Sequence, residues 1–299
     1  MRKLVVIGVG LIGGSFALAL RKAGIVDRIV GVGRSRENLD AALERGIIDV
    51  AHTLDDNWAA ELASADVVLV AAPLAQYPAL FATLAPAIGA KTVVTDAGSS
   101  KQDVVTAARA AFGDRLPRFV PAHPIAGSEQ SGALAAVPDL FDRRSVIITP
   151  IAETAPEALA CVSALWQSCG ARVTTLSSAD HDRLLAAVSH LPHVLAFVLV
   201  AELAERADSS EFFGRAGSGF RDFTRIAASS AEMWRDVALA NRDALLAEID
   251  RYGDALRSAR QLIEAQDGAG LADLFERAAA ARRRLDVSPG GDAKGQGSL

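Results

Sequence analysis

Residues 4–13 read Leu-Val-Val-Ile-Gly-Val-Gly-Leu-Ile-Gly and open a longer apolar stretch. The apolar start predicts a buried β-strand, and the glycine spacing fits the turn from a strand into a helix in dinucleotide-binding folds. The first glycine permits the tight turn, the second lets a pyrophosphate approach, and the third lets the helix pack on the sheet. Helix amides then face the phosphates. The predicted cofactor contacts here are Gly8, Gly10, Leu11, Ile12 and Gly13.

Short apolar runs alternate with helical patterns through the first half of the chain. The expected strands are residues 4–8, 28–32, 66–71, 92–95, 118–121, 146–149 and 172–175. The expected helices between them are residues 11–23, 36–44, 77–87, 101–111 and 156–168. This βαβ alternation predicts an α/β fold with a Rossmann-type, doubly wound parallel sheet.

The pattern changes near Leu176, after which we expect no strand. Helical patterns cover residues 179–207, 230–241, 242–265 and 271–285, and a Gly- and Ser-rich end follows. We therefore expect a dinucleotide-binding domain at residues 1–176, an all-helical substrate and dimerisation domain at 177–286, and a flexible tail at 287–299.

Composition narrows the class of protein. The chain has 299 residues, half of them apolar, and a net charge of −5, which gives no general attraction to nucleic acid or anionic membranes. Its two cysteines fit a reducing cytoplasm better than a disulfide framework. The apolar run from Leu191 to Ala201 is too short to span a bilayer, so we expect no membrane partner.

The end of the second predicted strand bears on the choice of dinucleotide. NAD sites usually carry an acidic residue there, for the ribose 2′-hydroxyl. Residues 31–36 read Gly-Val-Gly-Arg-Ser-Arg instead, and the first acid is Glu37. Arg34, Ser35 and Arg36 suit a 2′-phosphate, which favours NADP over NAD. In the alternative interpretation, Arg36 is a solvated residue of the next helix and Arg34 stacks on adenine.

Two polar loops follow predicted strands, where open α/β sheets bind ligands. One is Asp-Ala-Gly-Ser-Ser-Lys at residues 96–101, and the other is His-Pro-Ile-Ala-Gly-Ser at residues 123–128. His123 can exchange a proton near neutral pH, and a hydroxyl of Ser99 bonded to it would fix its orientation. Ser100, three residues before an aspartate, reads as a helix cap.

Three further histidines, His181, His190 and His193, lie at the junction of the predicted domains. Metal ligation is not favoured, because no cysteine or HExxH pattern accompanies them. Residues 217–225 form a glycine-containing segment with two arginines, Arg221 and Arg225, which could bind a substrate carboxylate. Pairing with acidic side chains on the surface explains these arginines equally well. Trp234 reads as a core or interface residue.

With these motifs assembled, the chain resembles the prephenate/arogenate dehydrogenase family of tyrosine biosynthesis over roughly residues 3–286. The most specific carriers are His-Pro-Ile-Ala-Gly at 123–127 and Ser-His-Leu-Pro-His at 189–193, and Phe-Arg-Asp-Phe-Thr-Arg at 220–225 is a further one. The resemblance implies oxidative decarboxylation of prephenate, arogenate or both, with hydride transfer to NADP or NAD, and a homodimer formed through the helical domain.

By the same resemblance, His123 accepts a proton from the substrate hydroxyl, Ser99 orients both, and Arg225 grips a carboxylate. The implied substrate-binding residues are Arg225, His190, His193, His181 and Ser100. Two alternatives stay open. A β-hydroxyacid dehydrogenase would normally need a lysine on the long helix, which residues 179–207 lack. A non-catalytic NADP-binding sensor would bind coenzyme without turnover.

Overall fold

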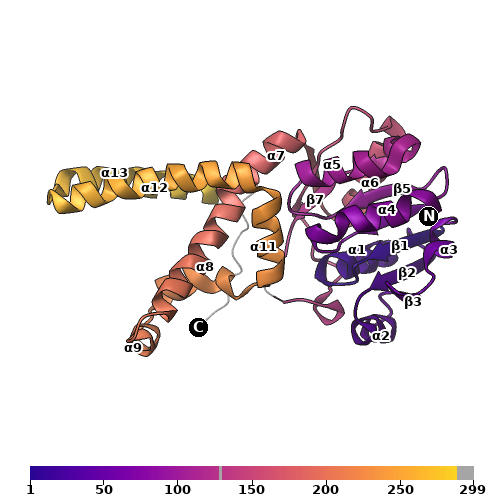
Figure 1. The fold of residues 1–299 in the computed structure, drawn as a ribbon, viewed down its shortest axis with the longest axis horizontal. Helices are drawn as coiled ribbons and strands as arrows, with labels where there is room; N and C mark the ends of the chain where they lie inside the picture. The colour runs from indigo at the N-terminus through magenta and orange to yellow at the C-terminus, as the bar shows by residue number, and fades with distance from the viewer. Residues whose placement is uncertain (128–129, 288–299) are drawn as a thin grey trace. The chain divides into compact units, whose positions relative to one another are not determined.

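The computed structural model describes residues 1–127 and 130–287. Six parallel strands form its main sheet, in the order β3-β2-β1-β4-β5-β6 (Figure 1). The strands are β1 (Lys3–Ile7), β2 (Arg28–Gly33), β3 (Val50–Thr53), β4 (Val67–Val70), β5 (Val93–Asp96) and β6 (Phe119–Val120). The strand order reverses beside β1, and such a switch point is where open α/β sheets bind ligands.

Helices cover both faces of this sheet. Successive side chains of β1 point to opposite sides, and every one of them is buried. Leu4 and Val6 join a core with α1 (Leu11–Lys22), α2 (Arg36–Glu44) and α6 (Pro156–Ser168). Val5 and Ile7 join the opposite core with α3 (Ala59–Leu62), α4 (Tyr77–Ala87) and α5 (Gln102–Phe112). The doubly wound architecture expected from the sequence is confirmed.

A second, three-stranded sheet was not expected. It consists of β7 (Ala122–Ile125), β8 (Ser145–Ile148) and β9 (Arg172–Thr175), and β7 runs antiparallel to β8. The expectation that the last strands extend the parallel sheet is wrong. Pro121 separates β6 from β7, and the chain passes there from one sheet to the other. As a result, the strand that carries the catalytic candidate His123 lies beside the main sheet.

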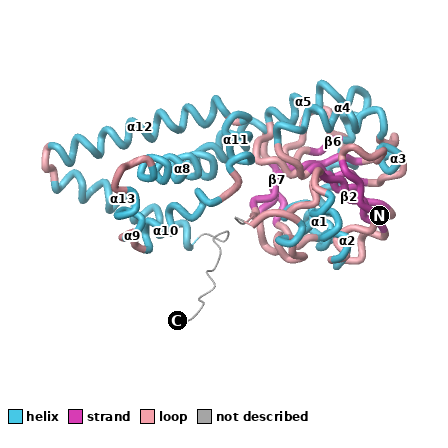
Figure 2. The backbone as a smooth tube through the Cα atoms, turned by 60° about the horizontal axis from the view of Figure 1, so that its bottom comes forward, coloured by secondary structure: helices cyan, strands magenta, loops and turns pink. Residues whose placement is uncertain are grey.

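From Ser178 onward, the described chain contains only helices and loops (Figure 2). The α-helices are α7 (Ser178–Leu185), α8 (Leu191–Ala204), α9 (Ser209–Gly214), α10 (Ser218–Thr224), α11 (Ala231–Ala240), α12 (Arg242–Glu264) and α13 (Gly268–Val287). The short turns of 3-10 helix are η1 (Leu74–Gln76), η2 (Gly113–Arg118), η3 (Ala133–Ala135) and η5 (Arg225–Ala228). Of these α-helices, α9 and α10 were not expected.

A π-helical turn, η4 (Ala186–His190), joins α7 to α8. Pro192 follows it in the first turn of α8. Because proline has no backbone N–H, the wider turn before it accommodates the carbonyls that lose their partner. The expected single helix is thus continuous but locally widened, and the turn contains His190 of the candidate site.

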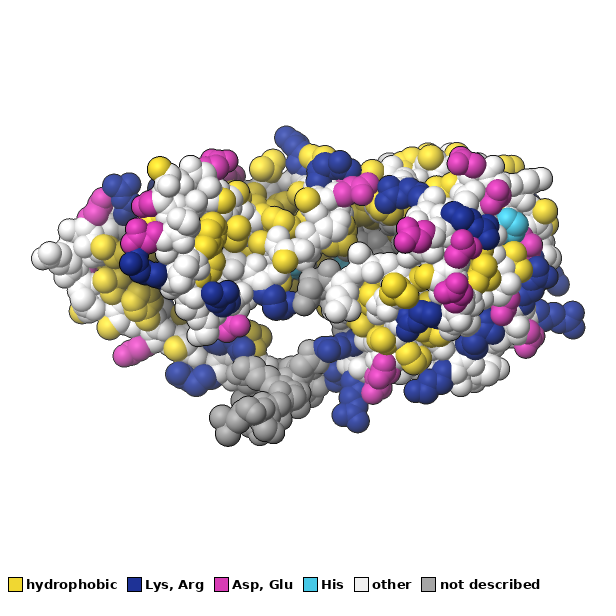
Figure 3. Space-filling view, turned by 90° about the horizontal axis from the view of Figure 1, so that it is seen from below, with side chains coloured by type: hydrophobic (Ala, Val, Ile, Leu, Met, Phe, Trp, Pro, Cys, Tyr) yellow, Lys and Arg dark blue, Asp and Glu magenta, His cyan; other side chains and the backbone are white. Residues whose placement is uncertain are grey.

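The helical stretch from Ser178 to Ala204 has 27 residues and is apolar enough, by length and composition, to cross a membrane. The sequence analysis considered only the run Leu191–Ala201 and therefore underestimated the length of this apolar helical stretch. Only 28% of its most apolar part is buried within the chain. Figure 3 shows groups of hydrophobic side chains at the molecular surface.

By compactness the chain divides into Met1–Leu245 and Leu246–Leu299. The second unit holds most of α12 and all of α13. The last strand ends at Thr175, and the predicted boundary at 176 stays a prediction. The predicted flexible tail, residues 287–299, lies outside the described residues from 288 on.

Candidate active site

The glycine turn after β1 is shaped to receive a pyrophosphate. Gly8 has a φ of +96°, and a Cβ there would lie 2.3 Å from the carbonyl oxygen of Ala71. A Cβ at Gly13 would lie 2.2 Å from a backbone oxygen, whereas a Cβ at Gly10 would meet no atom within 4 Å. No side chain caps the start of α1, so its first amides are available to an anion. These residues fit a dinucleotide.

Both arginines at the end of β2 are already in ion pairs. Arg34 Nη1 lies 3.4 Å from Oε1 of Glu232 at the start of α11, and Arg36 Nη2 lies 2.9 Å from Oδ1 of Asp40 on α2. Ser35 caps α2, because its hydroxyl accepts the backbone N–H of Asn38. A 2′-phosphate would therefore compete with carboxylates for these arginines.

His123 lies on β7 with 8% of its surface exposed, and its hydrogen-bond partner is another imidazole. The distance from its Nδ1 to Nε2 of His181 is 2.8 Å. The distance from Nδ1 of His181 to Oδ1 of Asp182 is 2.7 Å. We refer to His123, His181 and Asp182 as the relay.

The carboxylate at the end of the relay decides the tautomers. An ionised carboxyl group only accepts hydrogen bonds, so the Nδ1–H of His181 donates to Asp182. When His181 is neutral, its Nε2 then accepts, and the Nδ1–H of His123 must donate to it. This leaves Nε2 of His123 with a free lone pair. The relay therefore presents His123 as a base.

Burial lowers the pKa of His123 well below its usual value, and the neighbouring His181, Lys101 and His190 lower it further. A neutral imidazole results at neutral pH. The same burial raises the pKa of Asp182, but hydrogen bonds from His181 and the backbone amides of Gln102 and Lys101 outweigh it, so the net pKa is lowered. The carboxyl group of Asp182 is therefore ionised at neutral pH.

Asp182 also caps α5. It accepts the backbone N–H groups of Lys101 and Gln102, each at 2.8 Å, and its Oδ2 lies 3.4 Å from the hydroxyl oxygen of Ser100. The expectation that Ser100 caps this helix is wrong, because an aspartate from α7 does so. Ser100 is also fully buried, with its hydroxyl next to Asp182, and its expected contact with the substrate stays a prediction.

A buried ion pair holds the strand that carries His123. Lys101 and Asp96 are both 0% exposed, and Nζ of Lys101 bonds Oδ2 of Asp96. The same ammonium donates to the carbonyl oxygen of Ala122 at 2.8 Å, and the N–H of Ala122 donates to Oδ1 of Asp96 at 3.0 Å. Burial lowers the pKa of Lys101, which Asp96 partly offsets. Loss of either partner would leave an uncompensated buried charge beside the base.

His190 is 1% exposed, and Asn241 fixes its tautomer. The amide Nδ2 of Asn241 lies 3.0 Å from Nδ1 of His190 and donates to the carbonyl of Asp182 at 2.7 Å. Nδ1 of His190 therefore accepts, which makes its Nε2 a donor. This buried Nε2 makes no well-formed hydrogen bond, although the backbone carbonyl of Ser99 lies near the ring. Burial lowers the pKa of His190 to about 4, although Asp182 and the backbone carbonyl of Ser99 act in the other direction.

His193 stacks on Trp234 of α11, with ring centroids 3.5 Å apart. Both rings line a cavity of about 220 Å³. The Nδ1–H of His193 donates to the carbonyl of Ser189 at 2.8 Å. Burial lowers the pKa of His193, and the charge of Arg225 lowers it further.

The structure thus brings His123, His181, His190 and Asp182 together. Nδ1 of His123 bonds His181, so this imidazole has an orienting partner that was not expected, and the orientation of His123 by Ser99 stays a prediction. Ser99 itself is half-buried. Sequence reasoning missed Asp182, although an acid beside a histidine was visible, and it missed Asn241, which lies 51 residues from His190.

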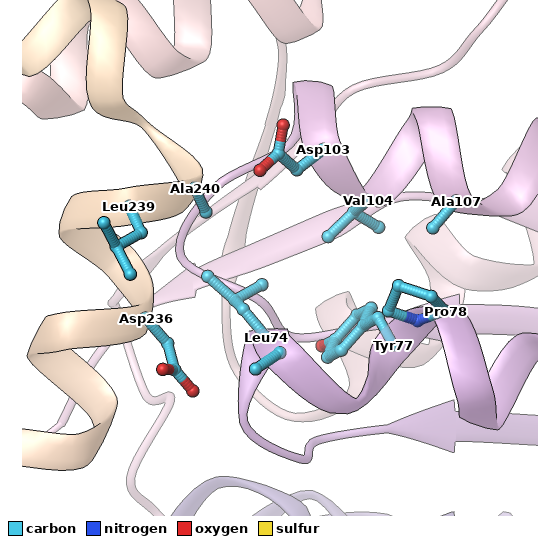
Figure 4. Close-up of a pocket in the computed structure, with 10 residues that line it drawn as sticks. Leu74, Tyr77, Pro78, Asp103, Val104, Ala107, Asp236, Leu239 and Ala240 are labelled. Carbon is cyan, nitrogen blue, oxygen red and sulfur yellow. The ribbon is translucent and has the colours of Figure 1, made fainter.

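A second cavity, of about 250 Å³, lies between α4, α5 and α11 (Figure 4). Its walls are mostly apolar, with Leu74, Tyr77 and Leu239 among them, and Asp103 and Asp236 stand at its margins. No group of three or more potential ligands for a metal ion occurs among the described residues.

Comparisons with known proteins agree with this arrangement. Residues 16–175 match the family model "Prephenate dehydrogenase, nucleotide-binding domain", and residues 177–277 match "Prephenate dehydrogenase, dimerization domain". Cyclohexadienyl dehydrogenase of Zymomonas mobilis is 33% identical over 296 residues, which cover 96% of this chain and 99% of that protein. Prephenate dehydrogenase of Bacillus subtilis is 36% identical over 273 residues, 91% of this chain and 72% of that protein.

A solved structure is also similar over nearly the whole chain. It is prephenate dehydrogenase from A. aeolicus in complex with hydroxyphenyl propionate and NAD+. The TM-score is 0.89 at 33% identity, and the match covers 96% of this chain and 99% of the other.

Proposed function

The chain belongs to the prephenate dehydrogenase family, and from that premise we propose that it catalyses the oxidative decarboxylation of prephenate. The observation that carries the proposal is the relay, which presents a basic Nε2 on His123. The bound nicotinamide would supply the hydride acceptor. The residues of this chain then have to hold the substrate, exclude water and move one proton.

His123 handles that proton. As hydride leaves C4 of the ring, Nε2 of His123 takes the proton of the 4-hydroxyl group. The carboxylate on the ring then departs as CO2, and the electrons of its bond to the ring complete the aromatic system. The proton returns from His123 to the oxygen, so that the products are 4-hydroxyphenylpyruvate, CO2 and the reduced coenzyme. The charge that develops on the imidazole is stabilised by Asp182 through His181.

We assign three polar groups to the substrate. Arg225 is assigned to a carboxylate, which a guanidinium binds with two parallel hydrogen bonds. The Nε2–H of His190, which makes no well-formed hydrogen bond within the chain, is assigned to a substrate oxygen. Ser99, with its hydroxyl not bonded to His123, is assigned to the 4-hydroxyl group.

The coenzyme preference has support for both dinucleotides. Arg34 and Arg36 suit the 2′-phosphate of NADP, whereas their ion pairs with Glu232 and Asp40 weaken that attraction. We propose that the enzyme accepts both NAD and NADP. Arogenate differs from prephenate only by an ammonium group in place of the keto group, and we propose it as a second substrate.

We further propose a homodimer formed through the helical segment matched by the dimerization model. The low burial of the apolar stretch Ser178–Ala204 supports this, since a second subunit would cover it. The two cysteines, Cys161 and Cys169, are free thiols, as a cytoplasmic location predicts.

The direct test is to measure initial rates of NAD and NADP reduction, each with prephenate and with arogenate. Turnover in any of the four assays supports the proposed reaction and ranks coenzymes and substrates. Coenzyme binding without turnover in all four would refute it and favour a sensor. A β-hydroxyacid dehydrogenase is disfavoured because the long helical stretch, residues 179–207, contains no lysine.

A further inference from the structure

The end of β2 lacks an acid of its own, but the structure supplies one from a distant part of the sequence. Glu232 lies in the first turn of α11, 198 residues from Arg34, and its Oε1 is 3.4 Å from Nη1 of that arginine. In the dinucleotide-binding fold, the residues that follow the second strand face the adenosine ribose. A carboxylate is thus present at this position, although the local sequence shows only Arg-Ser-Arg.

We propose that Glu232 is a determinant of coenzyme preference. The inference rests on the proposed use of a nicotinamide dinucleotide. A carboxylate accepts a hydrogen bond from a ribose 2′-hydroxyl, but it repels a 2′-phosphate. While Glu232 is paired with Arg34, the guanidinium is partly neutralised, so NAD is favoured. Without this carboxylate, Arg34 is available for the phosphate of NADP.

The position of Glu232 is fixed by the helix that carries it. The hydroxyl of Ser230 accepts the backbone N–H of Met233 and caps α11. Two residues further along, in the same turn, Trp234 stacks on His193. Glu232 is therefore held in the turn of α11 that also lines the cavity at His193.

The pair is also able to change partners. Its side chains are 57% and 48% exposed, and an exposed ion pair of this kind contributes little net free energy. A phosphate could displace the carboxylate, but at a cost that NAD does not incur. The Arg36–Asp40 pair differs, because both residues belong to α2, four positions apart, and stabilise that helix locally.

The test measures dissociation constants of NADH and NADPH by the fluorescence of the reduced nicotinamide, without substrate. For Glu232→Gln, we expect the preference for NADPH over NADH to rise about 2- to 5-fold, the range that loss of an exposed ion pair supplies. The matched control is Glu202→Gln on α8, which removes the carboxylate of another exposed Glu–Arg pair, the one with Arg206 just past the end of that helix. The control should leave the preference unchanged.

A second variant ties the effect to Arg34. In an Arg34→Ala background, Glu232→Gln should raise the preference for NADPH by less than it does in the original chain, because the repulsion of the phosphate is still relieved but the phosphate has no guanidinium to gain. An unchanged preference in the single variant, or an equal rise in the Arg34→Ala background, would overturn the proposal. Because binding is measured without turnover, absence of prephenate oxidation would refute the proposed function and leave this test standing.

Discussion

Replacing Asp182 by Asn tests the relay at the residue that sets its direction. The substitution keeps the shape of the side chain but exchanges one acceptor oxygen for an NH2 donor. If that NH2 faces His181, it donates to Nδ1 and reverses both tautomers, so that Nε2 of His123 carries a hydrogen and is no longer a base. If the NH2 group takes the place of Oδ2, it meets the backbone N–H of Gln102, which donates to that oxygen in the original chain, so two donors then face each other.

The magnitude follows from these contacts. A buried donor left without an acceptor costs about 1–3 kcal/mol, and this cost arises in either orientation. The hydrogen bond that stabilises the developing imidazolium contributes about 1.5–3 kcal/mol more when its acceptor is charged. The first cost is present before and during the reaction and therefore lowers Tm. Loss of the charged hydrogen bond, together with the reversed tautomer that removes the base, lowers kcat by about 10²- to 10⁴-fold.

The assay is steady-state kinetics of prephenate oxidation, together with coenzyme binding and thermal unfolding of the same preparation. We expect coenzyme affinity to be retained, with a lower Tm because the start of α5 loses a charged cap. The matched control is Asp180→Asn, an exposed carboxylate on the same helix, which should leave kcat unchanged. A kcat for Asp182→Asn within 3-fold of the original value would refute the role given to the relay.

The remaining predictions concern separate parts of the site. His123→Asn should lower kcat by about 10²- to 10⁴-fold while coenzyme affinity is retained, and near-normal turnover would remove this residue from its role as the base. Arg225→Ala should mainly raise KM for prephenate; an unchanged KM would mean that the carboxylate is bound elsewhere. The free energy of unfolding should fall as the pH drops from 6.5 towards 4, because burial lowers the pKa of His190 to about 4 and its imidazole therefore binds a proton first in the unfolded chain. The loss of stability from this residue should reach about 3 kcal/mol below pH 4, and it should be smaller in His190→Gln. Gly13→Ala should lower Tm, because its Cβ would lie 2.2 Å from a backbone oxygen, whereas Gly10→Ala should keep Tm and lose coenzyme affinity; equal Tm values would contradict the packing argument.

Much of the fold follows from local pattern. Strands such as β1 and β4 are uninterrupted apolar runs buried on both faces, which the sequence displays directly. The strand β3 was missed because Val-Ala-His-Thr, residues 50–53, has no such run and is only half-buried. The strand β7 was missed because Pro124 lies within it, and proline rarely marks a strand.

The candidate site was predictable where one residue carries its own signal. His123 stood out because a histidine in a polar loop is rare and chemically informative. Asp182 did not, because an acid on an amphipathic helix usually lies in solvent, and its burial depends on the start of α5, about 80 residues away. Glu232 could not be predicted as the partner of Arg34 for the same reason, since an ion pair between residues 198 positions apart leaves no local sequence pattern.

The helix α11 has a consequence for how the two ligands influence each other. Glu232, near its first residue, meets the coenzyme-binding loop, and Asn241, just past its last, holds His190 and the backbone of Asp182. These ends are about 14 Å apart along one rod of ten residues. A displacement of α11 at one end is therefore transmitted to the other without a chain of intermediate contacts. Thermodynamic reciprocity then requires that any factor by which the coenzyme alters substrate affinity is the factor by which substrate alters coenzyme affinity.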